Sequence, residues 1–135
     1  MMASVLVAAL ALVTVTACGN SDKGKESEGS EETITVGALA PLTGAVSVYG
    51  IAASNGVKLA IKEVNEAGGI DGKKIDLVLL DEKGDEQEAI TAFNRLVEEN
   101  KIVALLGDVT SKPTIAVAQR AATINMPMLT ATATA

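Results

Sequence analysis

The chain contains no histidine and no tryptophan, it has a single cysteine, and Tyr49 and Phe93 are its only aromatic residues. Without histidine or a second cysteine, the usual zinc sites and the Ser-His or Cys-His nucleophiles cannot be assembled within the chain. A disulfide within the chain is also excluded. Neither a G-x-S-x-G elbow nor a complete phosphate-binding glycine motif occurs. We therefore expect no catalytic residue, no metal and no cofactor, and a binding function is favoured.

Positive charge is also scarce. The chain has 11 Lys and Arg against 17 Asp and Glu, for a formal net charge of −6. Nucleic-acid-binding domains usually carry a basic patch or stripe, and this composition gives no such footprint. We expect no nucleic-acid partner.

The only cysteine, Cys18, follows an apolar leader. Residues 1–17 are apolar or small and end in Val15-Thr16-Ala17, which is typical of a signal peptide rather than of a membrane-spanning helix. Together with Cys18 they resemble a bacterial lipobox, which predicts a lipidated cysteine anchoring the protein to the outside of a cell membrane. The alternatives are an ordinary cleaved leader with a free thiol and a buried cysteine in a helix.

The chain after the leader divides into a tether and one folded unit. Residues 18–32 are mostly Gly, Ser, Asp, Glu, Lys and Asn, a composition that predicts a flexible tether because it buries little apolar surface. Residues 33–135 are rich in aliphatic side chains and have a length that suits a single domain or lobe.

Within residues 33–135, short apolar runs alternate with helical patterns. Strands are predicted over 33–39, 75–80, 102–106 and up to 129, and helices over 46–67, from Asp85 and from Ser111. This rhythm predicts an α/β fold, with a parallel sheet and helices on both of its faces. In the first helix seven apolar residues recur every three or four positions and form the apolar stripe of an amphipathic helix: Val46, Tyr49, Ala53, Val57, Ala60, Ile61 and Val64.

Open α/β sheets bind ligands beyond the carboxyl ends of their strands. The residues at those positions form a predicted rim that is rich in hydroxyls: Pro41, Thr43, Gly44 and Tyr49; Asp108, Thr110 and Ser111; Thr130, Thr132 and Thr134. Ser111 at a helix start suits a carboxylate, because unpaired backbone N–H groups and the helix dipole favour negative charge there. The alternative is that Ser111 only caps the helix. Thr132 and Thr134 can turn carbonyls and hydroxyls toward the same point, or can belong to an irregular polar loop, and the pattern leaves both readings open.

Several ordered motifs carry a resemblance to a known family. They are Ala40-Pro41-Leu42-Thr43-Gly44, Tyr49-Gly50, Val64-Asn65-Glu66-Ala67-Gly68-Gly69-Ile70, Gly107-Asp108-Val109-Thr110-Ser111 and Leu129-Thr130-Ala131-Thr132-Ala133-Thr134. In this order and spacing they resemble the solute-binding proteins of branched-chain amino-acid ABC importers. The resemblance covers nearly all of the chain from Ile34 to Ala135.

The resemblance implies a two-lobed type I periplasmic binding fold, and a monomer that delivers an amino acid to an ABC permease. It implies that Ser111 holds the ligand carboxylate, and that Thr134 contributes to both the carboxylate and the ammonium group. The carbonyl of Thr132 would bind the ammonium group, and Tyr49 would line the side-chain pocket. Since the family continues through a second lobe, we expect residues 33–135 to be an incomplete N-terminal lobe.

Two rival readings remain open. The same fold can bind another small polar ligand, such as a short amide or urea, or can serve as a sensor domain. A secreted α/β hydrolase is the other rival, and it would need a nucleophile elbow and a downstream histidine.

Overall fold

The computed structural model describes residues 32–134. Its elements are β1 (Thr33–Ala40), α1 (Ser47–Glu66), β2 (Lys74–Asp81), α2 (Glu86–Glu98), β3 (Ala104–Leu106), α3 (Ser111–Thr123) and β4 (Met128–Leu129). The alternation of strands and helices predicted from the sequence is confirmed, with boundaries within a few residues of those expected. The leader, Cys18 and most of the tether lie outside the described residues.

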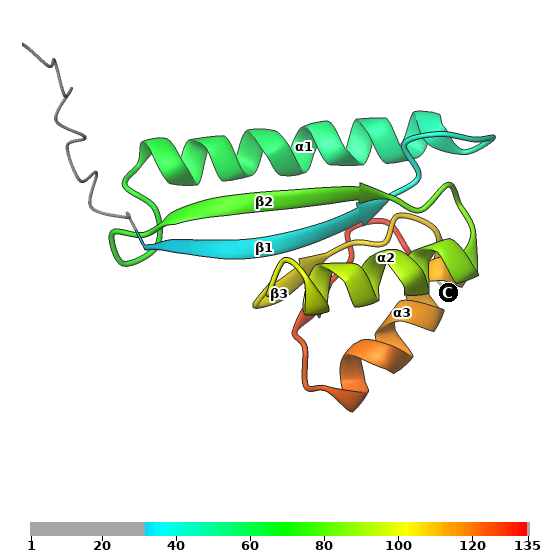
Figure 1. Cartoon of the computed structure of the whole chain (residues 1–135). Helices are drawn as coiled ribbons and strands as arrows, with labels where there is room; N and C mark the ends of the chain where they lie inside the picture. Colours follow the sequence, from blue (N-terminus) through cyan, green and yellow to red (C-terminus); the bar gives the residue numbers. More distant parts are fainter. Residues whose placement is uncertain (1–31, 135) are drawn as a thin grey trace, which may run out of the picture.

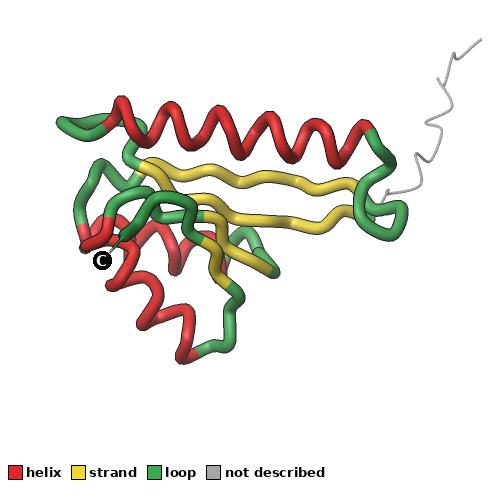
Figure 2. Tube along the Cα trace, turned by 180° about the vertical axis from the view of Figure 1, so that it is seen from behind, coloured by secondary structure: helices red, strands yellow, loops and turns green. Residues whose placement is uncertain are grey.

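The four strands form one parallel sheet in the order β2-β1-β3-β4. β1 pairs with β2 along its whole length, from Thr33 opposite Lys74 to Ala40 opposite Asp81. In Figure 1, α1 lies along one face of the sheet, while α2 and α3 lie on the other face. The view from behind in Figure 2 shows the same three layers. The predicted parallel sheet with helices on both faces is confirmed.

The main hydrophobic core lies between the sheet and the pair α2 and α3. Its buried members are Leu39, Ala89, Phe93, Leu96, Ile102, Leu105, Val117 and Ala121. They come from two strands, two helices and the segment before β3, so the core joins segments that are far apart in the sequence. Burial of these side chains is the dominant stabilising contribution to the lobe.

The helix α1 packs on the opposite face, and its buried side differs from the apolar stripe. Gly50 and Ser54 are its buried residues, whereas Tyr49 is 64% exposed and Val64 is 37% exposed. Three members of the apolar stripe, Tyr49, Ala60 and Val64, are therefore exposed in this structure. The small residues Gly50 and Ser54 let α1 approach the sheet closely. The side of the helix that faces the sheet is therefore not the side that hydrophobicity alone indicates.

Two polar motifs fix the ends of the helices. The Asp85 carboxylate accepts hydrogen bonds from the backbone N–H groups of Gln87 and Glu88, both at 2.9 Å, and thereby caps α2. At the carboxyl end of α1, the Asn65 side chain makes two hydrogen bonds with the backbone of Ile75 at the start of β2. Asn65 therefore connects the helix to the strand that follows it.

Among residues 32–134, no helix combines the length and the apolar character that a bilayer crossing requires.

Candidate functional site

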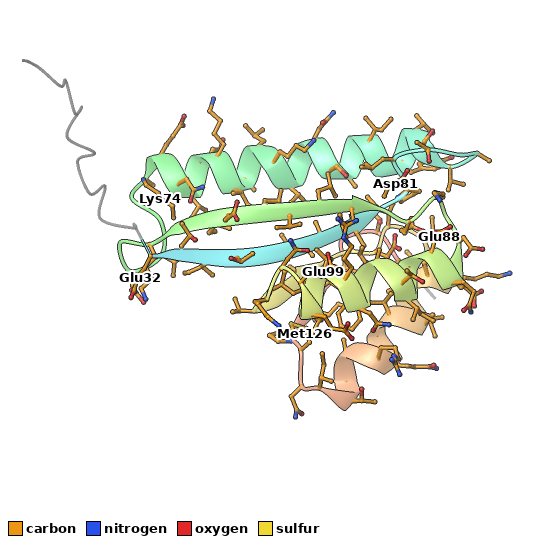
Figure 3. All side chains as sticks on the ribbon, in the orientation of Figure 1. Glu32, Lys74, Asp81, Glu88, Glu99 and Met126 are labelled. Carbon is orange, nitrogen blue, oxygen red and sulfur yellow. The ribbon has the colours of Figure 1, made fainter. Side chains whose placement is uncertain are left out.

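The candidate site lies at the carboxyl edge of the sheet. Figure 3 shows Lys74 and Asp81 at opposite ends of β2, and Glu32 at the same end as Lys74. The chain thus enters the lobe at the amino edge. Because the strands are parallel, the loops after β1, β2, β3 and β4 all emerge at the opposite edge. The predicted rim residues belong to these loops and to the helices that follow them.

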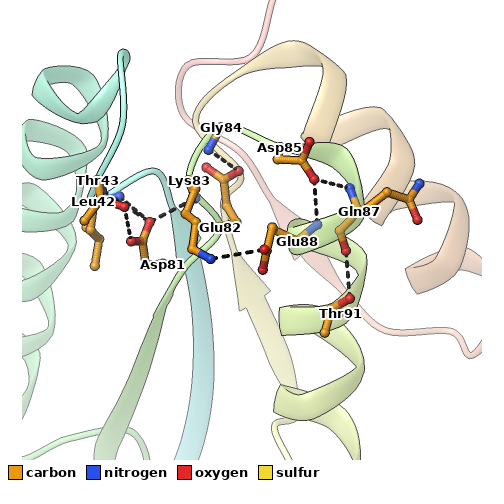
Figure 4. A network of polar contacts seen from close by, with 10 residues as sticks. All are labelled: Leu42, Thr43, Asp81, Glu82, Lys83, Gly84, Asp85, Gln87, Glu88 and Thr91. Carbon is orange, nitrogen blue, oxygen red and sulfur yellow. Dashed lines mark hydrogen bonds and ion pairs between the residues drawn. The ribbon is translucent and has the colours of Figure 1, made fainter.

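The loop after β1 is held by Asp81, the last residue of β2. Its carboxylate accepts hydrogen bonds from the Leu42 N–H at 2.8 Å and from the Thr43 hydroxyl at 2.6 Å, as Figure 4 shows. Burial by itself raises the pKa of Asp81, but the Thr43 hydroxyl and three backbone N–H groups outweigh that effect and hold the pKa below its ordinary value. An ionised Asp81 therefore fixes the Leu42-Thr43 part of the rim.

The loop after β4 is attached to the loop after β3. The Thr130 hydroxyl donates to the carbonyl of Asp108, and the Thr132 hydroxyl donates to the carbonyl of Val109, both at 2.7 Å. These two bonds place residues separated by more than twenty positions side by side. The predicted convergence of these two loops at the rim is confirmed.

Ser111 is the first residue of α3, and Thr110 occupies the cap position. The alternative that Ser111 is the helix cap is therefore wrong by one residue. The Thr110 side chain makes no capping hydrogen bond. In the first turn Pro113 has no N–H, and the N–H groups of Ser111 and Lys112 have no partner inside the helix. The start of α3 therefore offers a hydroxyl and two backbone donors to an anion.

A depression of about 330 Å³ lies between the start of α1 and these loops. Its lining residues are Tyr49, Ala52, Ala53, Val109, Thr110 and Thr132. The structure therefore brings Tyr49 and Thr132 together, next to the residue that precedes Ser111. Thr134 is exposed and does not line the depression. Val109 and the two alanines were missed because small or aliphatic side chains carry no recognisable signal in the sequence.

Two acidic side chains, Glu82 and Asp108, are fully buried behind the rim, each with 0% of its surface exposed. Burial raises the pKa of Glu82 to about 7, and the nearby charge of Asp108 adds to the rise. Burial also raises the pKa of Asp108, although hydrogen bonds from backbone N–H groups oppose it. The sequence placed Asp108 on the rim and did not reveal its pairing with Glu82.

Over the described range 32–134, no group of three or more Cys, Asp or Glu side chains is arranged to hold a metal ion. Asp81 and Asp85 instead accept hydrogen bonds from backbone N–H groups and from the Thr43 hydroxyl. The rim presents hydroxyls, carbonyls and backbone N–H groups. These groups suit the binding of a small polar ligand.

Comparison with known proteins identifies the class. A family model described as "Periplasmic binding protein" matches residues 33–135. The chain belongs to this family, and its fold is part of the type I periplasmic binding fold. The resemblance to branched-chain amino-acid binding proteins inferred from the sequence motifs is confirmed.

Three relatives show which kinds of periplasmic binding protein the chain is similar to. The chain is 41% identical over 102 residues to the Leu/Ile/Val-binding protein BraC3 of Rhizobium johnstonii, covering 76% of this chain and 28% of the relative. A branched-chain amino-acid transporter substrate-binding protein, LivJ of Streptococcus pneumoniae, solved with isoleucine, superimposes with a TM-score of 0.75 at 36% identity, over 77% of this chain and 30% of that one. A solute-binding protein of an ABC transporter from Rhodopseudomonas palustris, solved with 3,4-dihydroxybenzoic acid, has a TM-score of 0.68 at 26% identity, over 75% of this chain and 27% of that one. The chain therefore spans less than a third of the length of these three relatives.

Proposed function

We propose that the chain forms one lobe of an extracytoplasmic solute-binding protein that captures a branched-chain or related aliphatic amino acid for an ABC importer. The observation that carries this proposal is the start of α3, where Ser111 and unpaired backbone donors adjoin a depression lined by Tyr49 and Thr132. The names of BraC3 and LivJ support the ligand class, since both are described as binding or transporting branched-chain amino acids.

Each proposed role follows from the chemistry of the residue. Ser111 and the first N–H groups of α3 bind the carboxylate, because a helix N-terminus favours an anion. The carbonyl of Thr132 accepts from the ammonium group, and its hydroxyl is already bonded to Val109, which fixes the orientation of the loop. Thr134 supplies a further hydroxyl to the ligand head group. Tyr49 is exposed on α1 and packs against the ligand side chain.

The protein acts as a binder and not as an enzyme. A signal peptide over residues 1–17 and acylation of Cys18 would leave it anchored to the outside of the membrane. In Figure 3, Glu32 lies at the amino edge of the sheet, at the other end of β2 from Asp81. An anchor joined at that edge leaves the carboxyl edge free for ligand and for a permease. A second lobe supplies the facing wall of the pocket, and the complete protein functions as a monomer.

Calorimetric titration of the product of the complete gene tests the proposal. Leucine, isoleucine and valine are titrated against glycine, a short aliphatic amide and urea. Binding of the aliphatic amino acids with at least tenfold preference supports the proposal. Equal or better binding of the amide or urea would overturn the ligand class and favour the rival reading of the same fold.

A second ligand class is favoured by one specific comparison, the Rhodopseudomonas palustris protein solved with 3,4-dihydroxybenzoic acid. That compound also carries a carboxylate, so the start of α3 suits it equally well. It lacks an ammonium group and therefore needs no acceptor at Thr132. Including 3,4-dihydroxybenzoate in the same titration separates the two classes.

A further inference from the structure

Two buried acids lie behind the loop that presents Ser111. Glu82 directly follows β2, and its N–H donates to the carbonyl of Ala40 at the end of β1. Asp108 directly follows β3 and Gly107. β2 and β3 flank β1 on its two sides, so the two acids lie at the carboxyl edge on either side of the β1 end. Both are completely inaccessible to solvent.

In each acid, one carboxyl oxygen accepts a hydrogen bond and the other has no hydrogen-bond partner. Glu82 Oε2 accepts from the N–H of Gly84 at 2.8 Å, and Asp108 Oδ1 accepts from the N–H of Val109. Glu82 Oε1 and Asp108 Oδ2 have no partner with good hydrogen-bond geometry, although each carboxyl group is close enough to shift the pKa of the other. A buried polar atom without a partner costs free energy, and a buried unpaired charge costs more.

No lysine or arginine within residues 32–134 forms an ion pair with either acid. The other charged group that acts on Glu82 is Asp81, whose like charge also raises the pKa of Glu82. Two adjacent buried carboxylates without a cation cannot both remain ionised, as in other carboxyl pairs that share one proton. One proton between the two unpartnered oxygens would satisfy both.

We infer that Glu82 and Asp108 share one proton, with Glu82 as the acid and Asp108 as the carboxylate, and that this pair positions the loop of residues 107–111 for ligand binding. Both acids accept from backbone N–H groups, but a hydrogen bond with Glu82 lowers the pKa of Asp108 whereas the charge of Asp108 raises that of Glu82, so Asp108 is the better carboxylate. Glu82 and Asp108 are positioning residues, since neither lines the depression beside Tyr49.

The loop connects the pair to the site. The carbonyl of Asp108 accepts from Thr130, and the carbonyl of the next residue, Val109, accepts from Thr132. Ser111 follows two residues later at the start of α3. Loss of the shared proton leaves two buried like charges at the base of this loop, and their repulsion displaces the loop and the donors of α3. The ligand part of this inference rests on the proposed function, whereas the proton itself does not.

The direction of the pH dependence follows from the pKa. Because the pKa of Glu82 in the folded protein, about 7, lies above the ordinary value of 4.5, the folded state binds the proton more tightly than the unfolded state. The bound proton therefore stabilises the folded state fully below pH 4.5, the ordinary pKa of a glutamate. This stabilisation is lost as the pH rises through about 7.

The test uses the product of the complete gene and compares Glu82→Gln, which mimics the protonated acid, with wild type. Glu63→Gln, at an exposed position on α1, is the matched control. Carbon NMR of labelled Glu and Asp carboxyl groups is recorded against pH. In wild type, one resonance should titrate near pH 7 and should be absent from Glu82→Gln. Titration of every carboxyl group at ordinary values, near pH 4, would overturn the shared proton.

Asp108→Asn provides a second variant if Glu82→Gln folds poorly. Removing the charge at position 108 should move the high Glu82 midpoint to lower pH, because that charge contributes to its rise. An unchanged midpoint would overturn the pairing.

Thermal melting and ligand affinity are measured at about pH 5.5 and about pH 8.5. Wild type and Glu63→Gln should melt about 4 °C or more lower at the higher pH, whereas Glu82→Gln should lose most of this difference. Affinity for leucine should fall about fivefold or more in wild type over the same interval and stay constant in Glu82→Gln. A pH-independent affinity in wild type, with the NMR titration present, would overturn the positioning role. If leucine does not bind at all, the proposed function fails while the NMR and melting results still test the proton.

Discussion

Gly50 of α1 lies directly against the carbonyl of Pro41 in the loop after β1. A Cβ atom placed on Gly50 would lie 2.0 Å from the Pro41 oxygen, a distance that no real Cβ contact allows. Pro41 is itself fully buried. This contact sets how closely α1 approaches the carboxyl edge of the sheet, and so where Tyr49 stands beside the candidate site.

Gly50→Ala should therefore destabilise the protein by about 2 kcal/mol or more, because the added methyl group forces the helix or the loop to move. Gly56→Ala is the matched control on the same helix, since a Cβ atom there meets nothing within 4 Å. It should raise stability by about 0.5–1 kcal/mol through helix propensity. The two free energies of unfolding are measured by urea denaturation. Equal effects of the two substitutions would contradict the close contact at Gly50.

Asn65→Ala should lower the free energy of unfolding by about 1–3 kcal/mol. The substitution removes two part-buried hydrogen bonds to Ile75 and leaves backbone groups of β2 without partners. Asn55→Ala, at an exposed position on the same helix, should change stability by less than about 0.5 kcal/mol. The free energies of unfolding of both variants are measured by denaturant titration. If Asn65→Ala behaves like Asn55→Ala, the side chain does not connect α1 to β2.

Asp81→Asn should weaken the dependence of stability on acid pH. The pKa of Asp81 is held below its ordinary value, so its carboxylate stabilises the folded state above that value, and this contribution is lost as the pH falls through the folded pKa. The wild type should therefore lose more stability than the variant between neutral pH and about pH 3. Melting temperatures across this range measure the difference, with Asp76→Asn at an exposed position of the same strand as control. Parallel melting curves for wild type and Asp81→Asn would count against the role of the carboxylate.

Cys18→Ser tests the predicted lipid anchor. If the cysteine is acylated, the substitution should move the protein from the membrane fraction to the soluble fraction, because the serine hydroxyl is not a substrate for thioether formation. Ser21→Ala, in the same stretch of sequence, should leave the distribution unchanged. Retention of Cys18→Ser in washed membranes would rule out anchoring through this thiol.

The elements of the fold could be predicted from the sequence because aliphatic runs and helical periodicity report burial directly. The order of the strands could not, since the pattern shows that a strand is buried but not which neighbour it joins. The buried side of α1 could not be predicted either. The helix approaches the sheet through Gly50 and Ser54, and hydrophobicity gives no weight to small residues.

The candidate site was predictable to the extent that it depends on strand ends. Thr132 lies by the loop before Ser111, as parallel topology requires. The helix cap was misplaced by one residue, because Ser is preferred to Thr at a helix cap and the sequence therefore favours Ser111, whereas Thr110 holds the cap position without a side-chain capping bond. Glu82 and Asp108 were not recognised as a pair, because they follow different strands and their burial arises only when β1 lies between them.

The proposed binding of the ligand carboxylate at the start of α3 is tested by calorimetric titration of Ser111→Ala with leucine. Ser47→Ala is the matched control, since Ser47 is likewise the first residue of its helix but belongs to α1 and not to α3. In the product of the complete gene, Ser111→Ala should weaken binding by about 1.5–3 kcal/mol, the scale of a hydrogen bond to a charged group, while Ser47→Ala binds like wild type. Unchanged affinity in Ser111→Ala, with the protein folded and wild type binding leucine, would contradict carboxylate binding by Ser111.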